Sequence, residues 1–179
     1  MIKTIRIMLI PNKKQKTKLF QYANTARFAY NWALGREKEN YKNSGKFLSD
    51  GELRKEFTQL KKIDEYSWLN EISNNVTKQS IKDACNAYKR FFKGYSKFPK
   101  FKSRKYSIPS FYQDNVKIKF SDTYVKIEGF TTSKKKNKQK INWIRLAEHN
   151  RIPTDCKYTN PRIKYDGLNW WLTVGVEYE

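Results

Sequence analysis

Residues 89–105 carry the clearest chemical signal in this sequence, because cations and aromatic rings alternate there without an acidic residue. The segment reads KRFFKGYSKFPKFKSRK, with eight Lys or Arg and five Phe or Tyr. Cations at this density repel one another and are stabilised beside a polyanion, while aromatic faces can stack on bases or sugars. Taken alone, the segment could equally be a solvated basic loop whose aromatic side chains pack into the nearest core.

The whole chain shares this basic character. It has 38 Lys and Arg against 17 Asp and Glu in 179 residues, a formal net charge of +21 and a pI near 9.9. Such an excess favours a nucleic-acid partner. A membrane surface is the competing polyanion, but no stretch approaches the roughly 18 to 20 apolar residues of a membrane-spanning helix, and the N-terminus lacks a secretory apolar region. We therefore expect a cytoplasmic protein with no membrane partner.

Residues for catalysis or metal binding do not form a recognisable pattern. His149 is the only histidine, and no cysteine lies near it in the sequence, whereas a zinc site needs several such ligands at suitable spacing. Cys85 and Cys156 form no motif and fit a reducing compartment as ordinary buried thiols. Two-metal nuclease chemistry needs several converging carboxylates, and the acids gather mainly on one helical segment. We expect no catalytic residue, no metal and no cofactor.

The elements that position the basic residues begin with one strand and continue with helices. Period-two alternation predicts a strand at residues 3–10, and apolar spacings of three and four predict a helix at about 13–42. Ser49 and Glu52 have the spacing of a capping box that begins a short helix. A further helix is predicted at about 75–92.

The two faces of the helix at 75–92 differ in character. One stripe is apolar: Ile81, Ala84, Tyr88 and Phe91. A second is a lysine row: Lys78, Lys82, Lys89 and Lys93. A lysine row is usually only a solvated face, but this one leads directly into residues 89–105. That continuity favours a surface that follows phosphates.

The C-terminal part of the chain has the pattern of short strands. The β-rich runs are residues 116–119, 124–127, 141–144, 161–165 and 170–178. A basic loop at 133–140 separates two of them. We predict an α+β fold: a small antiparallel β-barrel that takes back the first strand, with the helical block as an insertion.

Six stretches in order resemble the N-terminal half of TnpB, the OrfB-type RNA-guided nuclease of bacterial insertion sequences and presumed ancestor of type V CRISPR effectors. They are LIPN (9–12), ARFAYNW (26–32), SWL (67–69), AYKRFF (87–92), FPKFK (98–102) and WWLTV (170–174). No single stretch is specific, but the six in order with fitting spacing are. The resemblance covers essentially the whole chain.

The resemblance implies a wedge-type β-barrel of residues 1–11 and 100–179 and an inserted helical recognition domain of residues 12–99. In that family these parts hold a guide RNA and read a short motif beside the DNA target. By position, the motif-reading residues are Asp50, Arg54, Asn74, Lys78, Tyr112 and Gln113. They differ from the side chains of known relatives, so a different motif would be read. The family's RuvC-like nuclease and zinc-binding domains would begin after Glu179, so we expect no nuclease activity from this chain.

The residues expected at RNA or DNA phosphates are all cations. They are Lys82, Lys89, Arg90, Lys93, Lys97, Lys100, Lys102, Arg104, Lys105, Lys134, Lys135 and Lys136. Asn74 and Lys78 are four residues apart on one helical face, where Asn can pair with adenine and Lys can donate to guanine or thymine. The alternative for Asn74 is that it only caps its helix.

Three functions are compatible with these observations. The first is the nucleic-acid-binding lobe of a TnpB-like protein, with guide RNA and target DNA as partners. The second is a guide-free DNA-binding regulator whose helical block reads a major groove. The third is the recognition half of a nuclease that a second chain completes in trans.

Overall fold

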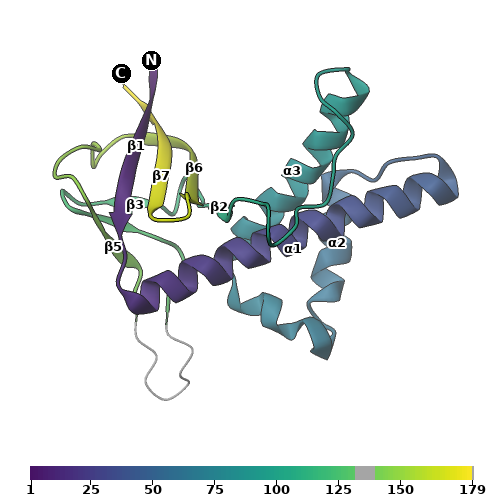
Figure 1. Ribbon diagram of the computed structural model, residues 1–179, viewed down its shortest axis with the longest axis horizontal. Helices are drawn as coiled ribbons and strands as arrows, with labels where there is room; N and C mark the ends of the chain where they lie inside the picture. The colour runs from purple at the N-terminus through teal and green to yellow at the C-terminus, as the bar shows by residue number, and fades with distance from the viewer. Residues whose placement is uncertain (132–139, 179) are drawn as a thin grey trace. The chain divides into compact units, whose positions relative to one another are not determined.

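The computed structural model describes residues 1–131 and 140–178 and divides into two compact units. The sheet unit consists of Met1–Ala23 and Ile108–Glu179, and the helical unit of Asn24–Ser107. Helix α1 (Lys13–Ser44) begins in the first unit and continues in the second (Figure 1). We expected boundaries after residues 11 and 99; the assignment of the two parts as wedge and recognition domains stays a prediction.

The sheet unit contains seven antiparallel strands in the order β2-β6-β7-β1-β5-β4-β3. Their bounds are β1 Ile2–Ile10, β2 Ser110–Tyr112, β3 Lys119–Phe120, β4 Tyr124–Lys126, β5 Trp143–Leu146, β6 Lys157–Tyr165 and β7 Trp170–Glu177. The first strand lies between two strands from the C-terminal part of the chain (Figure 1). The α+β class and the return of the first strand to this sheet are therefore confirmed.

The predicted β-barrel is wrong, because the sheet does not close. Its edge strands β2 and β3 are only three and two residues long, and within the described residues β2 pairs only with β6 and β3 only with β4. Closure requires the two edge strands to pair with each other. Strand β1 also joins β5 through only two register pairs, Leu9 with Leu146 and Ile10 with Arg145.

Alternation in the long strands gives the sheet unit its core. Ile5, Ile7 and Leu9 of β1 are buried, as are the even-numbered positions of β7 from Trp170 to Val176. The first turns of α1 add Leu19 and Tyr22 to this core. Tyr22 Oη donates to Glu128 O at 2.9 Å, and the Tyr22 ring meets those of Phe111 and Phe130 edge-on.

Strand β6 begins four residues earlier than the sequence predicted, because a bulge carries it through Asn160 and Pro161. The register with β7 shifts between Thr159 and Arg162, and Asn160 has a φ of 46°. Asn tolerates this left-handed conformation better than most residues, and a bulge accommodates the proline that cannot donate to the ladder.

The helical unit consists of the rest of α1, α2 (Asp50–Leu60), the 3₁₀ helix η1 (Asp64–Glu71) and α3 (Asn74–Phe92). Its core comprises Ala29, Ala33, Leu34, Leu53, Phe57, Leu69, Ile81, Ala84, Cys85 and Tyr88. These positions include the predicted apolar stripe of α3, except that Phe91 is only half-buried.

Serine side chains cap both shorter helices at their N-termini. Ser49 Oγ accepts from the Glu52 backbone N–H at 3.2 Å, which confirms the predicted start of α2. Ser73 Oγ accepts from the Asn75 backbone N–H at 3.2 Å and is the N-cap of α3. Asn74 is therefore the first helical residue, and the alternative that Asn74 itself caps the helix is wrong.

Candidate nucleic-acid interface

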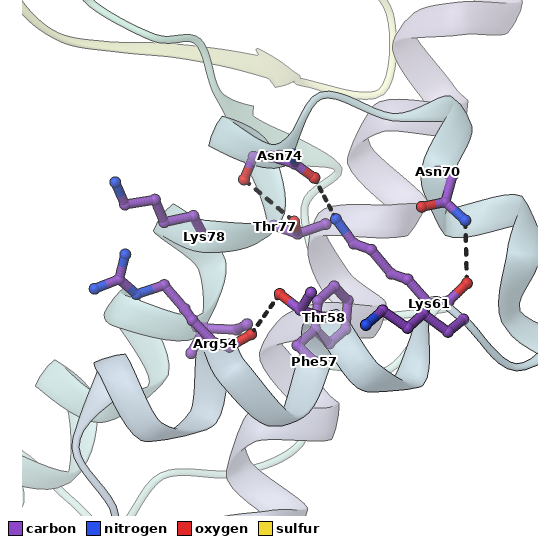
Figure 2. Close-up of a pocket in the computed structure, with 10 residues that line it drawn as sticks. Arg54, Phe57, Thr58, Lys61, Asn70, Asn74, Thr77 and Lys78 are labelled. Atoms are coloured by element: carbon purple, nitrogen blue, oxygen red, sulfur yellow. Dashed lines mark hydrogen bonds between the residues drawn. The ribbon is translucent and has the colours of Figure 1, made fainter.

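A pocket of about 360 Å³ lies in the helical unit, with walls from α2, α3 and η1 (Figure 2). We call it the α2–α3 pocket. It is lined by Arg54, Phe57, Thr58, Lys61, Lys62, Asn70, Asn74, Thr77, Lys78 and Ile81. Four of these residues are cations and none is acidic. Three of the predicted motif-reading residues, Arg54, Asn74 and Lys78, therefore share one pocket.

Arg54 and Lys78 extend toward the same side of the α2–α3 pocket from different helices (Figure 2). Arg54 Nη2 lies 3.4 Å from Asp50 Oδ2, one turn earlier on α2. That ion pair places Asp50 beside the pocket, as a partner that orients Arg54. The Arg54 Nε–H is buried without a hydrogen-bond acceptor among the described residues.

Lys61 reaches across the α2–α3 pocket to Asn74 (Figure 2). Its ammonium donates to Asn74 Oδ1, and burial lowers the pKa of Lys61 from its usual value. Asn70 Nδ2 donates to the Lys61 carbonyl at 3.1 Å, which anchors the backbone there. An adenine that pairs with both amide atoms of Asn74 has to displace Lys61. Alternatively, Asn74 orients Lys61, and the Lys61 ammonium is the group that donates to a base.

Sequence reasoning missed Lys61, Lys62, Asn70 and Thr77 as pocket residues. The pair Lys61–Lys62 follows the last turn of α2, where cations are ordinary because they interact favourably with the helix dipole. No sequence spacing relates these residues to α3, since η1 intervenes.

Tyr112 and Gln113 belong to the sheet unit. Gln113 is buried; its Oε1 accepts from the Glu128 backbone N–H at 3.0 Å, and its Nε2 donates to Asp114 O at 3.2 Å. Its amide thus stabilises the backbone and offers no exposed edge to a base. Tyr112 is half-buried on β2, with the Arg162 guanidinium 5.3 Å from its ring centre.

The lysine row of α3 is exposed to solvent. Lys78, Lys82, Lys89 and Lys93 are all exposed, and so is Arg90. They lie away from the buried stripe of the same helix. The row therefore presents a continuous cationic face from the α2–α3 pocket to the basic–aromatic segment, residues 89–105.

Two hydrogen bonds fix the backbone of the basic–aromatic segment to α1 at Lys102. Lys102 N donates to Asn31 Oδ1 at 2.8 Å, and Asn31 Nδ2 donates to Lys102 O at 2.9 Å. The Lys102 ammonium lies 4.0 Å from the centre of the Tyr30 ring. The predicted phosphate-binding cations of this segment are all exposed: Lys97, Lys100, Lys102, Arg104 and Lys105.

The aromatic side chains of this segment make ring contacts and are exposed to different extents. Phe98 packs edge-on against Phe91 and Tyr88, with ring centres 5.0 and 5.6 Å apart. Tyr95 is 75% exposed and Phe101 53% exposed. Phe98 is itself 45% exposed. The rings of the segment therefore pack on neighbouring rings beside the core and still remain accessible for stacking.

The other sequence predictions concern residues outside these surfaces. Lys134, Lys135 and Lys136 lie outside the described residues. His149 is exposed, as expected, while Cys85 is buried and Cys156 is half-buried. Within residues 1–131 and 140–178, no three His, Cys, Asp or Glu side chains lie together as a metal site. None of the helices in that part of the chain has the length and apolar character to cross a bilayer.

An exposed cationic helix face that continues into accessible aromatic rings is typical of nucleic-acid-binding proteins. Comparison with known proteins agrees with this class. A helix-turn-helix domain model of the OrfB/IS605 type matches residues 1–46. In those residues the structure has β1 and the single helix α1.

Three curated relatives extend the comparison. The chain is 24% identical over 178 residues to the candidate RNA-guided DNA endonuclease InsQ of Escherichia coli strain K12. A candidate RNA-guided DNA endonuclease of Streptomyces pristinaespiralis is 29% identical over 97 residues, and a candidate transposase of Paramecium bursaria Chlorella virus 1 is 29% identical over 99 residues. These matches confirm the resemblance to OrfB-type, TnpB-like proteins.

The relatives differ from this chain in length. The match to InsQ covers 99% of this chain but 41% of InsQ. The matches to the Streptomyces and virus proteins cover 54% and 51% of this chain, and 24% and 22% of those proteins. The chain thus spans about two fifths of the length of InsQ.

Proposed function

We propose that this chain is the nucleic-acid-binding lobe of a TnpB-like, RNA-guided DNA-targeting protein. In this function it binds a guide RNA and reads a short DNA motif beside the target, without a nuclease site of its own. The observation that carries the proposal is the α2–α3 pocket, where four cations and the Asn74 amide meet without a carboxylate among the lining residues. The match over 99% of the chain to InsQ supports it.

The α2–α3 pocket supplies the groups that can distinguish base edges. Arginine and lysine donate to guanine O6 and N7, and asparagine pairs with adenine. Arg54 and Lys78 extend to the same side of the pocket, so they can reach neighbouring bases. Each good bidentate contact discriminates against the wrong base by about 1–3 kcal/mol.

The exposed cations of α3 and of residues 97–105 have a different role. They hold phosphates, which sets affinity and register but carries no sequence information directly. Accessible rings such as Tyr95 and Phe101 add stacking on unpaired bases. Base pairing by the guide supplies most of the target specificity in such a system.

Two other functions compete with this proposal. A guide-free DNA-binding regulator is favoured by the helix-turn-helix domain model that matches residues 1–46. The second competitor is the recognition half of a nuclease that a second chain completes in trans.

Purification of the chain from its host, followed by sequencing of bound nucleic acid, tests the proposal. We expect one RNA of defined sequence to copurify. RNA-free protein that protects a fixed DNA duplex would favour the regulator. Metal-dependent cleavage that appears only after a partner protein is added would favour the nuclease in trans. Either result without bound RNA contradicts the proposed function.

A further inference from the structure

Two rows of side chains cross the face of the sheet opposite its core, outside the α2–α3 pocket. The strand registers align β2, β6, β7 and β1 at these positions. The first row is Tyr112, Arg162, Thr173 and Arg6, and the second is Ser110, Lys164, Trp171 and Met8. We call these eight positions the outer sheet face. Three are cations, two are aromatic and none is acidic.

Cations and rings contact one another across the strands of the outer sheet face. The Arg6 guanidinium carbon lies 3.8 Å above the centre of the Trp171 ring. The Arg162 guanidinium carbon lies 5.3 Å from the centre of the Tyr112 ring. A guanidinium stacked on an aromatic ring is flat on its other side and can receive a base there.

A hairpin turn holds Trp171 in this orientation. Trp171 Nε1 donates to Asp166 Oδ2 at 2.8 Å. The other oxygen of the Asp166 carboxylate accepts from the backbone N–H groups of Leu168 and Asn169. Asp166 is thus fixed within its own turn and also interacts electrostatically with Arg6, while Arg162 Nε donates to Asn160 Oδ1 at 2.9 Å. These interactions orient the two guanidinium groups of the face.

The face is accessible along both rows. Arg6 and Lys164 are exposed, and the remaining six positions are half-buried. The residues between the rings and cations are small or flexible: Ser110, Thr173 and Met8. Four neighbouring strands span roughly 14 Å at about 4.8 Å per spacing. Trp171 on β7 and Tyr112 on β2 therefore offer separate positions for two bases.

We propose that the outer sheet face binds a single-stranded nucleic acid, with bases stacked on the Arg6–Trp171 and Arg162–Tyr112 pairs and phosphates near Lys164. The eight positions include three cations and no acidic residue, so their charge is complementary to that of a polyanion. A duplex does not fit the ring pairs, because its base faces are already stacked within the helix. The surface is distinct from the α2–α3 pocket, so this proposal and the proposed function can fail separately.

Substitution of Trp171 tests the stacking, with a matched control at the same position. Trp171→Leu and Trp171→Phe both lose the bond to Asp166, but only Phe keeps a flat ring. With a fluorescent 15-nucleotide oligouridine and the full chain, we expect Trp171→Leu to weaken binding about 5-fold or more. Trp171→Phe should stay within about 2-fold of the unsubstituted chain. A 15-base-pair duplex should bind all three proteins alike.

Two further measurements locate the contact. Arg6→Gln keeps Trp171 and Asp166 in place and should weaken oligouridine binding several-fold more than Lys117→Gln, an exposed control in the same unit. Photocrosslinking with 4-thiouridine should modify a peptide that contains Trp171 or Tyr112. If Trp171→Leu does not fold by circular dichroism, Arg6→Gln and the crosslink carry the test.

Three results would overturn this proposal. In one, Trp171→Leu and Trp171→Phe bind oligouridine equally well, and no crosslink falls on the outer sheet face. In another, Arg6→Gln and Lys117→Gln behave alike. In the third, polyglutamate of equal charge competes as well as oligouridine, which would indicate charge without stacking. If one RNA of defined sequence still copurifies with the chain in these cases, the proposed function stands and only the outer sheet face is wrong.

Discussion

Asn31 and Lys102 exchange two hydrogen bonds, so one helical side chain fixes the basic–aromatic segment to α1. The two donor–acceptor distances are 2.9 and 2.8 Å. The amide of Asn31 thus replaces the backbone partner that a strand would have given to residue 102. The relationship links the fold of α1 to the position of the phosphate-binding cations.

Replacement of Asn31 with Ala should release residues 100–104. Each lost hydrogen bond costs about 1 kcal/mol, and the exposed site lets water satisfy part of the backbone. We expect faster amide exchange at Lys102 and several-fold weaker RNA binding. Asn43→Ala, an exposed change on the same helix, is the control. Unchanged exchange at Lys102 in Asn31→Ala would contradict this role.

Gly175→Ala should destabilise the sheet unit. A Cβ at Gly175 would lie 2.1 Å from Thr159 Oγ1 and 3.2 Å from Thr159 O, beside the β6 bulge. Overpacking of this kind typically costs about 1–3 kcal/mol. Thermal unfolding of Gly175→Ala and of the unsubstituted chain measures this loss of stability. Gly51→Ala in α2 meets nothing closer than 3.8 Å and should leave the free energy of unfolding unchanged or raise it by up to about 1 kcal/mol.

The thiol of Cys85 should be unreactive in the folded protein. Burial, followed by the charge of Glu37, raises the pKa of Cys85 to about 12, so almost no thiolate forms at neutral pH. With a thiol reagent at pH 8, we expect rapid labelling of Cys156 and slow labelling of Cys85. Cys85→Ser and Cys156→Ser variants separate the two signals. Equal labelling rates would show that the α1–α3 core opens readily.

Affinity for nucleic acid should fall steeply as salt rises. Each neutralised phosphate contributes a slope of about −0.9 for duplex DNA, or about −0.7 for a single strand, in a plot of log affinity against log salt. A double Lys100→Ala, Lys102→Ala variant should reduce the magnitude of that slope by the contribution of one to two phosphates. If the affinity of the unsubstituted chain is nearly constant from low to moderate salt, binding of phosphates by the lysine and arginine side chains is contradicted.

Much of the fold was predictable because its long elements have clear periods. The alternation in β1 and β7 placed both strands, and the stripe of Ile81, Ala84 and Tyr88 oriented α3. That the sheet stays open could not be predicted, since closure depends on whether the edge strands, of two and three residues, pair with each other. Strand β2 is too short to show a period. The start of β6 was missed because Asn160 and Pro161 are typical of a turn, although here they form a bulge within the strand.

The candidate site was predictable only in part. The resemblance placed Arg54, Asn74 and Lys78 as a group, and these three line one pocket. Lys61 could not be added from sequence, because its position depends on the path of η1. The burial of Gln113 could not be predicted either, because the sequence does not indicate that its side-chain amide bonds to the backbone of Glu128 and Asp114.

Selection from a randomised library of target-adjacent DNA motifs, with the guide RNA bound, tests whether the α2–α3 pocket reads the DNA motif. The variants are Arg54→Ala, Asn74→Ala and Lys78→Ala, compared with the double Lys100→Ala, Lys102→Ala change. We predict that the first three change which motif is enriched, each by about 1–3 kcal/mol of discrimination. The double variant should weaken every motif alike. Equal weakening of all motifs by the pocket variants, or a new preference in the double variant, would contradict the proposed function.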